Sequence, residues 1–157
     1  MTIAPDSVFV FLGVCVVAAP MALLAALSLA LLVRGHAAEA LVGRMTHIAI
    51  ITGLLGALGV LGMMLICDTR HVTLELGDWV LLDEEHFHFT LKFIFDRLSV
   101  PFVILSYVLV GTIGAFAHAF LHREPGFTRF FVCYALFLLG MVTSSLAGTI
   151  ETLFAGW

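Results

Sequence analysis

Residues 8–33 read VFVFLGVCVVAAPMALLAALSLALLV, a stretch that contains no Asp, Glu, Lys or Arg. A helix needs about 20 predominantly apolar residues to cross a lipid bilayer, so this stretch is long enough to do so. The preceding residues, MTIAPDS, include no basic residue, and no cleavage site follows the apolar stretch. We therefore interpret it as a membrane span and not as a cleaved signal peptide.

The composition of the whole chain agrees with this interpretation. Hydrophobic residues make up 62% of the 157 residues and charged residues 11%, whereas about 25% of the residues in soluble domains are charged. A single core in a chain of this length would leave much apolar surface in water. The sequence therefore predicts an integral membrane protein. No cluster of basic residues occurs, so we expect no nucleic-acid partner.

Three further apolar runs follow the first. They predict spans over residues 47–67, 100–121 and 130–147, joined to their neighbours by polar connections at 34–46 and 121–129. The glycines of the second run recur every three residues and should form a groove for a neighbouring helix; they are Gly53, Gly56, Gly59 and Gly62. The expected fold is an all-α membrane domain over the whole chain, with about four spans and the start of a fifth.

Residues 68–95 break this helical pattern. Apolar residues alternate with polar ones from Val72 to Leu76 and again from Phe87 to Phe93, which is the period of a strand. The pair Gly77-Asp78 and the acidic residues 83–85 supply turn chemistry. We predict an extramembrane β-hairpin between the second and third spans.

The basic residues indicate how the chain is oriented. Arg34, Arg44, Arg123 and Arg129 lie in the two connections on one side of the predicted bundle, which is the cytoplasmic side by the positive-inside rule. The N-terminus, the hairpin and the end of the fourth span lie on the other side, which collects most of the acids. In a bacterium, this arrangement predicts a multi-pass inner-membrane protein with a periplasmic N-terminus and a periplasmic hairpin.

The last ten residues, GTIETLFAGW, place a carboxylate in an apolar stretch. We expect Gly148 to turn the chain and Thr149 to cap a new helix, with Glu151 in its first turn, where the helix dipole favours a negative charge. This helix would re-enter the membrane and reach Trp157 inside the hydrocarbon, leaving terminal carbonyls without partners. We therefore expect either that the chain is the start of a longer protein or that a second polypeptide completes it.

The cysteines and the absence of known motifs both argue against a catalytic, cofactor or metal site within this chain. Cys15, Cys67 and Cys133 show no C-x-x-C spacing and lie in or beside apolar runs, so we predict small buried apolar side chains. The sequence also has no dinucleotide-binding glycine pattern, no cysteine cluster for iron and sulfur, and no phosphate loop. It predicts no catalytic residues, no cofactor site and no metal site.

Several stretches resemble a known family. LELGDWV (74–80), FDRLSVPF (95–102), FLHREPGFTRFFVCYALFLLGM (120–141) and ETLFAGW (151–157) resemble the N-terminal part of the antiporter-like membrane subunits. These are chain 5 (chain L) of NADH:quinone oxidoreductase, complex I, and the large subunits of Mrp cation/proton antiporters. The resemblance implies proton translocation by a glutamate of span five that follows a G-W pair, here Gly156-Trp157. Complex I chains commonly carry Asp-Asn where this chain has Gly148-Thr149.

The sequences LHREPGFTRFF and GTIETLFAGW look most like a side branch of this family. That branch is the B subunit of a two-component inorganic carbon transporter, which pairs with a large A subunit carrying a zinc site. Three hypotheses follow: the N-terminal part of a proton-conducting subunit coupled to a partner's activity, a membrane subunit of a bicarbonate or CO2 uptake complex, or a non-transporting structural subunit. The first two imply membrane lipid and other membrane subunits as partners, and the helices before Trp157 would scaffold the buried charges beyond it.

Four ionisable residues are candidates for a proton path or an interface. His118 and His122 lie four apart on one face of the third span, and an ionisable group inside a span is a functional candidate by default. His118 could equally snorkel towards the polar turn that follows. Asp96 can cap the third span, and Glu151 is expected at the membrane interface.

Other patterns have structural explanations. Gly140, Ser144 and Gly148 recur every four residues and predict a thin face for helix packing. His86 and His88 would share one face of a strand, where they could bind a metal with the nearby acids or simply form the wet face of the hairpin. The Phe-rich segments at 87–95 and 127–137 predict hydrophobic anchors in preference to a quinone site.

Overall fold

The computed structural model describes residues 5–34, 38–68, 71–82 and 87–157 of the chain. It confirms the predicted fold class, with four helices that are long and apolar enough to cross a membrane and a two-stranded hairpin between the second and third. The elements in chain order are α1 (Pro5–Arg34), α2 (Glu39–Ile66), β1 (His71–Leu82), β2 (Phe87–Asp96), α3 (Ser99–Phe120), α4 (Phe127–Leu146) and α5 (Ile150–Gly156).

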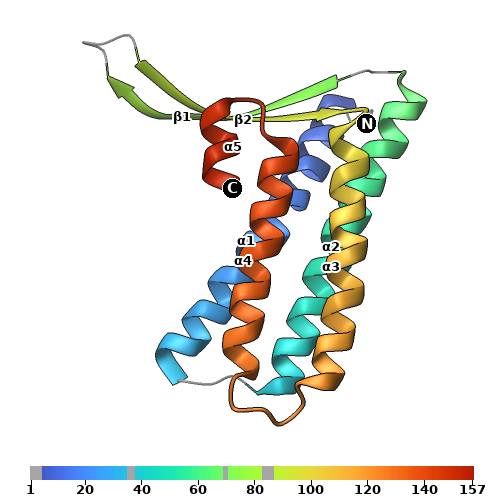
Figure 1. The fold of residues 1–157 in the computed structure, drawn as a ribbon. Helices are drawn as coiled ribbons and strands as arrows, with labels where there is room; N and C mark the ends of the chain where they lie inside the picture. The colour runs from blue at the N-terminus through green and yellow to red at the C-terminus, as the bar shows by residue number, and fades with distance from the viewer. Residues whose placement is uncertain (1–4, 35–37, 69–70, 83–86) are drawn as a thin grey trace.

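The four long helices form a ring in which each helix packs against two neighbours. The neighbouring pairs are α1 with α2, α2 with α3, α3 with α4, and α4 with α1. The hairpin lies across the end of the bundle where α1 begins, and α5 folds back beside α4 (Figure 1). Large apolar side chains such as Leu32, Ile66 and Phe120 are exposed on the outside. Lipid can solvate such a surface, because its acyl chains are as apolar as these side chains.

Two predicted boundaries were wrong. The second span begins at Glu39, so most of the predicted polar connection 34–46 is helical, and α4 begins at Phe127 instead of 130. Polar residues remain compatible with a helix near its end, because they can face outward and reach the membrane surface. Arg44 is exposed in this way, whereas Thr46 faces inward and is buried.

The cysteines also differ from the prediction of buried side chains. Cys67 and Cys133 are exposed and Cys15 is only partly buried. A small apolar side chain gains little by facing the protein instead of lipid, because both surroundings are apolar. Composition therefore did not determine which face of its helix each cysteine occupies.

The hairpin is antiparallel, and its register runs from His71 opposite Asp96 to Leu82 opposite Phe87. The register shifts between Glu75 and Val80, so Gly77-Asp78 lies within β1 at an irregularity and is not the turn that we expected. A glycine inside a strand often marks such a bulge. The other predicted turn residues, 83–85, lie outside the described residues.

The hairpin is fastened to the bundle at the junction between α4 and α5. The backbone N–H of Gly148 donates to the Lys92 carbonyl at 2.8 Å, and Phe93 forms an isolated antiparallel bridge with Ala147. Phe93 and Phe95 are buried beneath the sheet. The hairpin and the turn after α4 therefore form one connected cap on this end of the bundle.

A proline in α1 explains the main polar contact of the bundle core. Pro20 has no N–H, so the carbonyl of Val16, four residues earlier, loses its helical donor. The hydroxyl of Tyr107 in α3 donates to this carbonyl at 2.6 Å. In lipid, an unpaired backbone carbonyl costs several kcal/mol, so the tyrosine replaces a bond that water cannot supply.

The glycines of α2 accommodate these contacts. A Cβ placed on Gly53 would lie 2.2 Å from the Tyr107 hydroxyl, so the tyrosine ring occupies the space of the missing side chain. Gly56 faces Val16 and Leu12 of α1 instead, Gly59 faces Leu12, and a Cβ on Gly62 would meet nothing within 4 Å. The predicted groove exists, but it receives side chains from two different helices.

Candidate functional site

The candidate residues separate to the two ends of the bundle. His118 and His122 lie at the end with the α3–α4 turn, whereas Asp96 and Glu151 lie at the hairpin end. The structure therefore does not bring the four predicted residues into one site. The residues at each end make separate contacts.

His118 points into the bundle and not towards the outer surface. A Cβ placed on Gly43 of α2 would lie 2.5 Å from the His118 Nε2 atom, so the ring rests directly on this glycine. The ring also makes edge contacts with Phe127 and Phe131 of α4, at centroid distances of 5.5 and 6.4 Å. The imidazole thus fills the junction of α2, α3 and α4.

Glu39 connects the α3–α4 turn to the first turn of α2. Its Oε2 lies 2.7 Å from the Nδ1 of His122, and its Oε1 accepts the backbone N–H of Arg123 at 3.0 Å. Arg123 has a φ of 67°, a left-handed conformation that non-glycine residues rarely adopt. The carboxylate also lies where the dipole of α2 favours negative charge. His122 therefore takes part in a contact between elements at the edge of the membrane.

Asp96 lies just before α3, whose N-cap residue, Leu98, has no side-chain cap of its own. The Oδ1 of Asp96 accepts the backbone N–H groups of Leu98 at 2.8 Å and Ser99 at 2.6 Å, at the start of α3. Two N–H groups that the helix itself cannot satisfy are thereby paired. This geometry gives Asp96 a structural role.

The start of α5 also follows the prediction. The Oγ1 of Thr149 accepts the backbone N–H of Thr152 at 3.2 Å, and Glu151 lies in the first turn of the helix. The side chain of Glu151 is partly buried. The cap directs α5 back alongside α4 (Figure 1).

The predicted thin face of α4 packs against the backbone of α5. A Cβ on Gly140 would lie 2.7 Å from the Gly156 carbonyl oxygen, and a Cβ on Gly156 would lie 2.7 Å from the backbone N of Ser144. Gly148 does not share this contact, because it faces Lys92 and Ile94 of the hairpin. The three residues therefore support two different interfaces.

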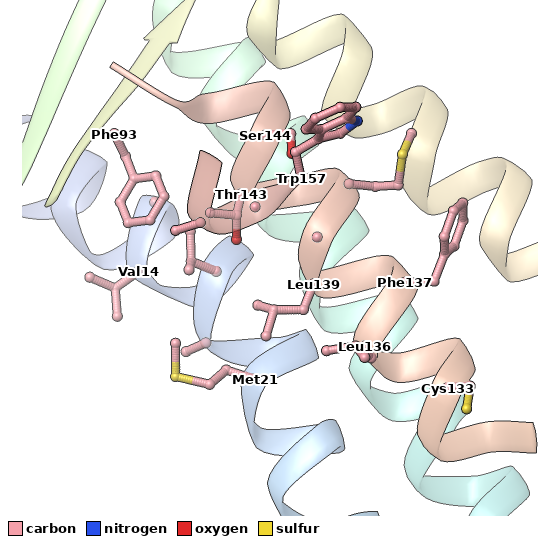
Figure 2. Close-up of a pocket in the computed structure, with 17 residues that line it drawn as sticks. Val14, Met21, Phe93, Cys133, Leu136, Phe137, Leu139, Thr143, Ser144 and Trp157 are labelled. Atoms are coloured by element: carbon pink, nitrogen blue, oxygen red, sulfur yellow. The ribbon is translucent and has the colours of Figure 1, made fainter. Parts of the chain in front are cut away.

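A large apolar recess lies beside this contact. It has a volume of about 1050 Å³ and is bordered by α1, α4 and α5, with Phe93 of β2 at one edge. Figure 2 shows Val14 and Met21 of α1 across the recess from Leu136 and Leu139 of α4. Almost all of the lining residues are apolar or small, so the recess could accept hydrocarbon or an apolar helix.

The described residues hold no charged side chain in the bundle core. The buried polar residues among them are Thr46, Ser106, Thr128 and Thr152. No group of three or more potential metal ligands occurs in the part of the chain that the structure describes. His86 and the side chain of His88 lie outside that part, so the choice between a metal site and the wet face of the hairpin stays untested.

Sequence reasoning missed three residues of the bundle: Glu39, which joins α2 to the α3–α4 turn, Thr46, which is buried in α2, and Tyr107, which joins α3 to α1. The first two were assigned to a polar connection, so their positions on a helix were not considered. A signal for Tyr107 was present, because Pro20 within a span implies a carbonyl that needs a donor from another helix. The sequence could not identify which helix supplies it.

Comparisons with known proteins agree with this layout. Residues 79–131, from within β1 into α4, match a protein-family model described as "NADH-Ubiquinone oxidoreductase (complex I), chain 5 N-terminus". The chain is 24% identical over 105 residues to NADH-ubiquinone oxidoreductase chain 5 of Strongylocentrotus purpuratus and 28% identical over 90 residues to that of Petromyzon marinus. These alignments cover 66% and 57% of this chain, but only 16% and 15% of the relatives. The resemblance to the N-terminal part of the antiporter-like subunits is confirmed.

Proposed function

We propose that this chain forms the N-terminal helices of a proton-conducting, chain 5-like membrane subunit, whose proton translocation is coupled to a partner's activity. The observation that supports this most directly is the match of residues 79–131 to the chain 5 N-terminus. The matched segment includes β2, α3 and the α3–α4 turn, which supply the hairpin side of the contact with the α4–α5 junction and the rings of His118 and His122. The functional proposal thus rests on a likeness over residues 79–131 of the 157.

Within such a subunit, the role of these helices is to scaffold charged residues carried elsewhere. Among the described residues, the buried polar side chains are hydroxyls, while the ionisable candidates lie near the ends of the bundle. The four long helices, joined by tyrosine hydrogen bonds, can therefore support neighbouring helices, but their described residues place no charged side chains in the bundle core. His118 and His122 remain the candidates for a proton path within these helices.

We further propose a bacterial inner membrane location with the hairpin in the periplasm. The chain is a multi-pass membrane protein, and Arg34, Arg44, Arg123 and Arg129 all lie towards the end of the bundle opposite the hairpin. Basic residues beside membrane spans are retained on the cytoplasmic side. The proposed partners are other subunits of a membrane complex.

The functional proposal is tested on the native assembly. The chain is tagged in its own host, its complex is purified from membranes, and the co-purified subunits are identified by mass spectrometry. Inside-out membrane vesicles are then assayed for NADH-driven acidification with a pH-sensitive dye. Co-purification with an NADH-oxidising module, and loss of acidification when the gene is deleted, are the expected results.

Two other outcomes would replace this proposal. Co-purification with a large zinc-containing protein, together with loss of bicarbonate uptake on deletion, would favour the carbon-uptake alternative suggested by the wording LHREPGFTRFF. A complex whose ion transport is unchanged by deletion would favour the purely structural subunit.

Orientation is tested separately, by labelling introduced cysteines. Thr73 in β1 and Glu124 in the α3–α4 turn are both exposed, and each is replaced by Cys in a chain whose three native cysteines are replaced by Ala. An impermeant maleimide added to intact spheroplasts should label Thr73→Cys only, and both variants after permeabilisation. Labelling of Glu124→Cys alone in intact spheroplasts would reverse the proposed orientation.

A further inference from the structure

Thr46 differs from three other hydroxyl-bearing residues of the spans. Ser106, Thr112 and Ser145 each donate to a carbonyl of the preceding turn of their own helix, at 2.7 to 2.8 Å. This is the usual arrangement for a hydroxyl within a helix. The Oγ1 of Thr46 has no hydrogen-bond partner, although the residue is only 2% exposed. A buried hydroxyl without a partner is unfavourable.

Thr46 lines a small cavity between α2 and α3, and Phe131 of α4 lies on its border. The cavity has a volume of about 10 Å³, which suffices for one water molecule. It exists partly because Gly111 of α3 has no side chain, so that a Cβ there would meet only Ile50 of α2, at 3.1 Å. The volume excludes any larger ligand.

A second polar group lines the same cavity. The ring of His118 rests on Gly43, which lies three residues before Thr46 and therefore on the same face of α2. His47 also borders the cavity, but its Nδ1 already pairs with the Gly43 carbonyl at 2.9 Å. A buried water needs two to four polar partners, and Thr46 and His118 provide them from two different helices.

We propose that this cavity binds one water molecule, which hydrogen-bonds to the Oγ1 of Thr46 and to a ring nitrogen of His118. The water pairs the otherwise unpaired hydroxyl and joins α2 to α3 at the end of the bundle near the α3–α4 turn. It also gives the imidazole a hydrogen-bond partner within the helix junction. This site does not depend on the proposed proton conduction, because it follows from the unpaired hydroxyl and the volume of the cavity.

The direct test is water-edited solid-state NMR of the full chain in lipid bilayers, with labelled Thr, Ser and His. Magnetisation from water should reach the side chains of Thr46 and His118 at short mixing times. Ser106 is the matched control, because it is equally buried, at 3% exposed, but bonds to its own helix; it should receive little. Absence of transfer at Thr46 in the unmodified chain would overturn the proposal without any variant.

Two substitutions then identify the water ligand. Thr46→Val keeps the shape of the side chain and removes the hydroxyl, so transfer to His118 should fall at least about threefold, whereas Thr46→Ser should retain it. The thermal unfolding midpoint should be lower for Thr46→Val than for Thr46→Ser. A midpoint for Thr46→Val that is equal to or higher than that of Thr46→Ser would show that the hydroxyl gains no stabilisation from a bound water, and it would contradict the proposal.

Discussion

Two glycine contacts in this molecule look alike in sequence but are filled differently. At Gly53 the missing side chain is replaced by the ring of Tyr107, whose hydroxyl continues to the carbonyl of Val16. At Gly140 the space is occupied by the backbone carbonyl of Gly156. The first contact joins three long helices in the middle of the bundle, whereas the second joins α4 to a helix of seven residues.

The difference shows that the effect of substituting a glycine depends on whether the neighbouring group can move away from the added methyl. Tyr107 is fully buried, so it cannot move without breaking its hydrogen bond. The short helix α5 can separate from α4 while the four long helices stay together, because its contacts are with α4 and β2. We therefore expect a global effect at Gly53 and a local one at Gly140.

The largest effect should come from Gly53→Ala. The added methyl would overlap the Tyr107 ring and displace its hydroxyl from Val16, which combines overpacking with a lost buried hydrogen bond. We expect the free energy of unfolding to fall by about 3 kcal/mol, measured by denaturation in mixed micelles. Gly62→Ala is the matched control in the same helix, because its methyl would meet nothing. Equal stability of the two variants would show that the Tyr107 ring does not depend on the space at Gly53.

Gly140→Ala should act mainly on α5. The methyl would contact the Gly156 carbonyl oxygen, and α5 would shift away at a cost of about 2 kcal/mol. Hydrogen exchange of the amides of residues 150–157 should accelerate about tenfold or more, while the exchange of α2 and α3 stays unchanged. Gly126→Ala serves as the control, since nothing lies within 4 Å of its added methyl. Faster exchange throughout the bundle would show that α5 is not a separable element.

The two buried tyrosines allow a finer comparison. Tyr107→Phe leaves the Val16 carbonyl without a donor, whereas Tyr134→Phe removes a bond to the Val110 carbonyl. The residue four positions after Val110 is Gly114, which has a backbone N–H. The Val110 carbonyl therefore still has a donor within its own helix. We expect a loss of about 1–2 kcal/mol for Tyr107→Phe and a clearly smaller loss for Tyr134→Phe, measured in the same micelle assay.

Pro20→Ala provides the decisive partner substitution for Tyr107→Phe. An alanine at this position can donate its N–H to Val16, so Tyr107→Phe should cost less in the Pro20→Ala background. The interaction energy of this double-mutant cycle should be at least about 0.5 kcal/mol. Additive effects would show that the tyrosine hydroxyl does not replace the donor missing at Pro20.

The smallest effect is expected at the edge of the membrane. Glu39→Gln weakens the pair with His122, whose side chain is 58% exposed, so water and salt screen the interaction. We expect a loss of unfolding free energy of less than about 1 kcal/mol, decreasing as salt is added. Glu124→Gln is the control, because it removes an equal charge from the neighbouring turn. A loss as large as that of Gly53→Ala would contradict the view that lipid-embedded contacts dominate.

Much of the fold could be predicted from local patterns. The spans follow from uninterrupted apolar runs, the hairpin from alternation, and the cap of α5 from Thr149. The boundaries failed where a polar helix end resembles a loop, as at Glu39 and Arg44. Local composition does not distinguish a polar loop from a polar first turn, because both are solvated.

The candidate sites were less predictable. The spacing of His118 and His122 placed both on one helical face, but it did not show that one ring enters a helix junction and the other pairs with Glu39. Nor did the repeat of Gly140, Ser144 and Gly148 reveal that its last member serves the hairpin. These assignments depend on which helices are neighbours.

The sequence alone determined that this protein lies in lipid and which four stretches are apolar enough to cross it, because each of these depends on the transfer of a single segment from water to hydrocarbon. Only the tertiary structure decided which side chain donates to the carbonyl left unpaired by Pro20, and which buried hydroxyl has no partner within the described residues. Those outcomes depend on contacts between segments far apart in the chain, such as the 91 residues between Val16 and Tyr107. No local pattern encodes such a pairing, because it arises only when the helices pack.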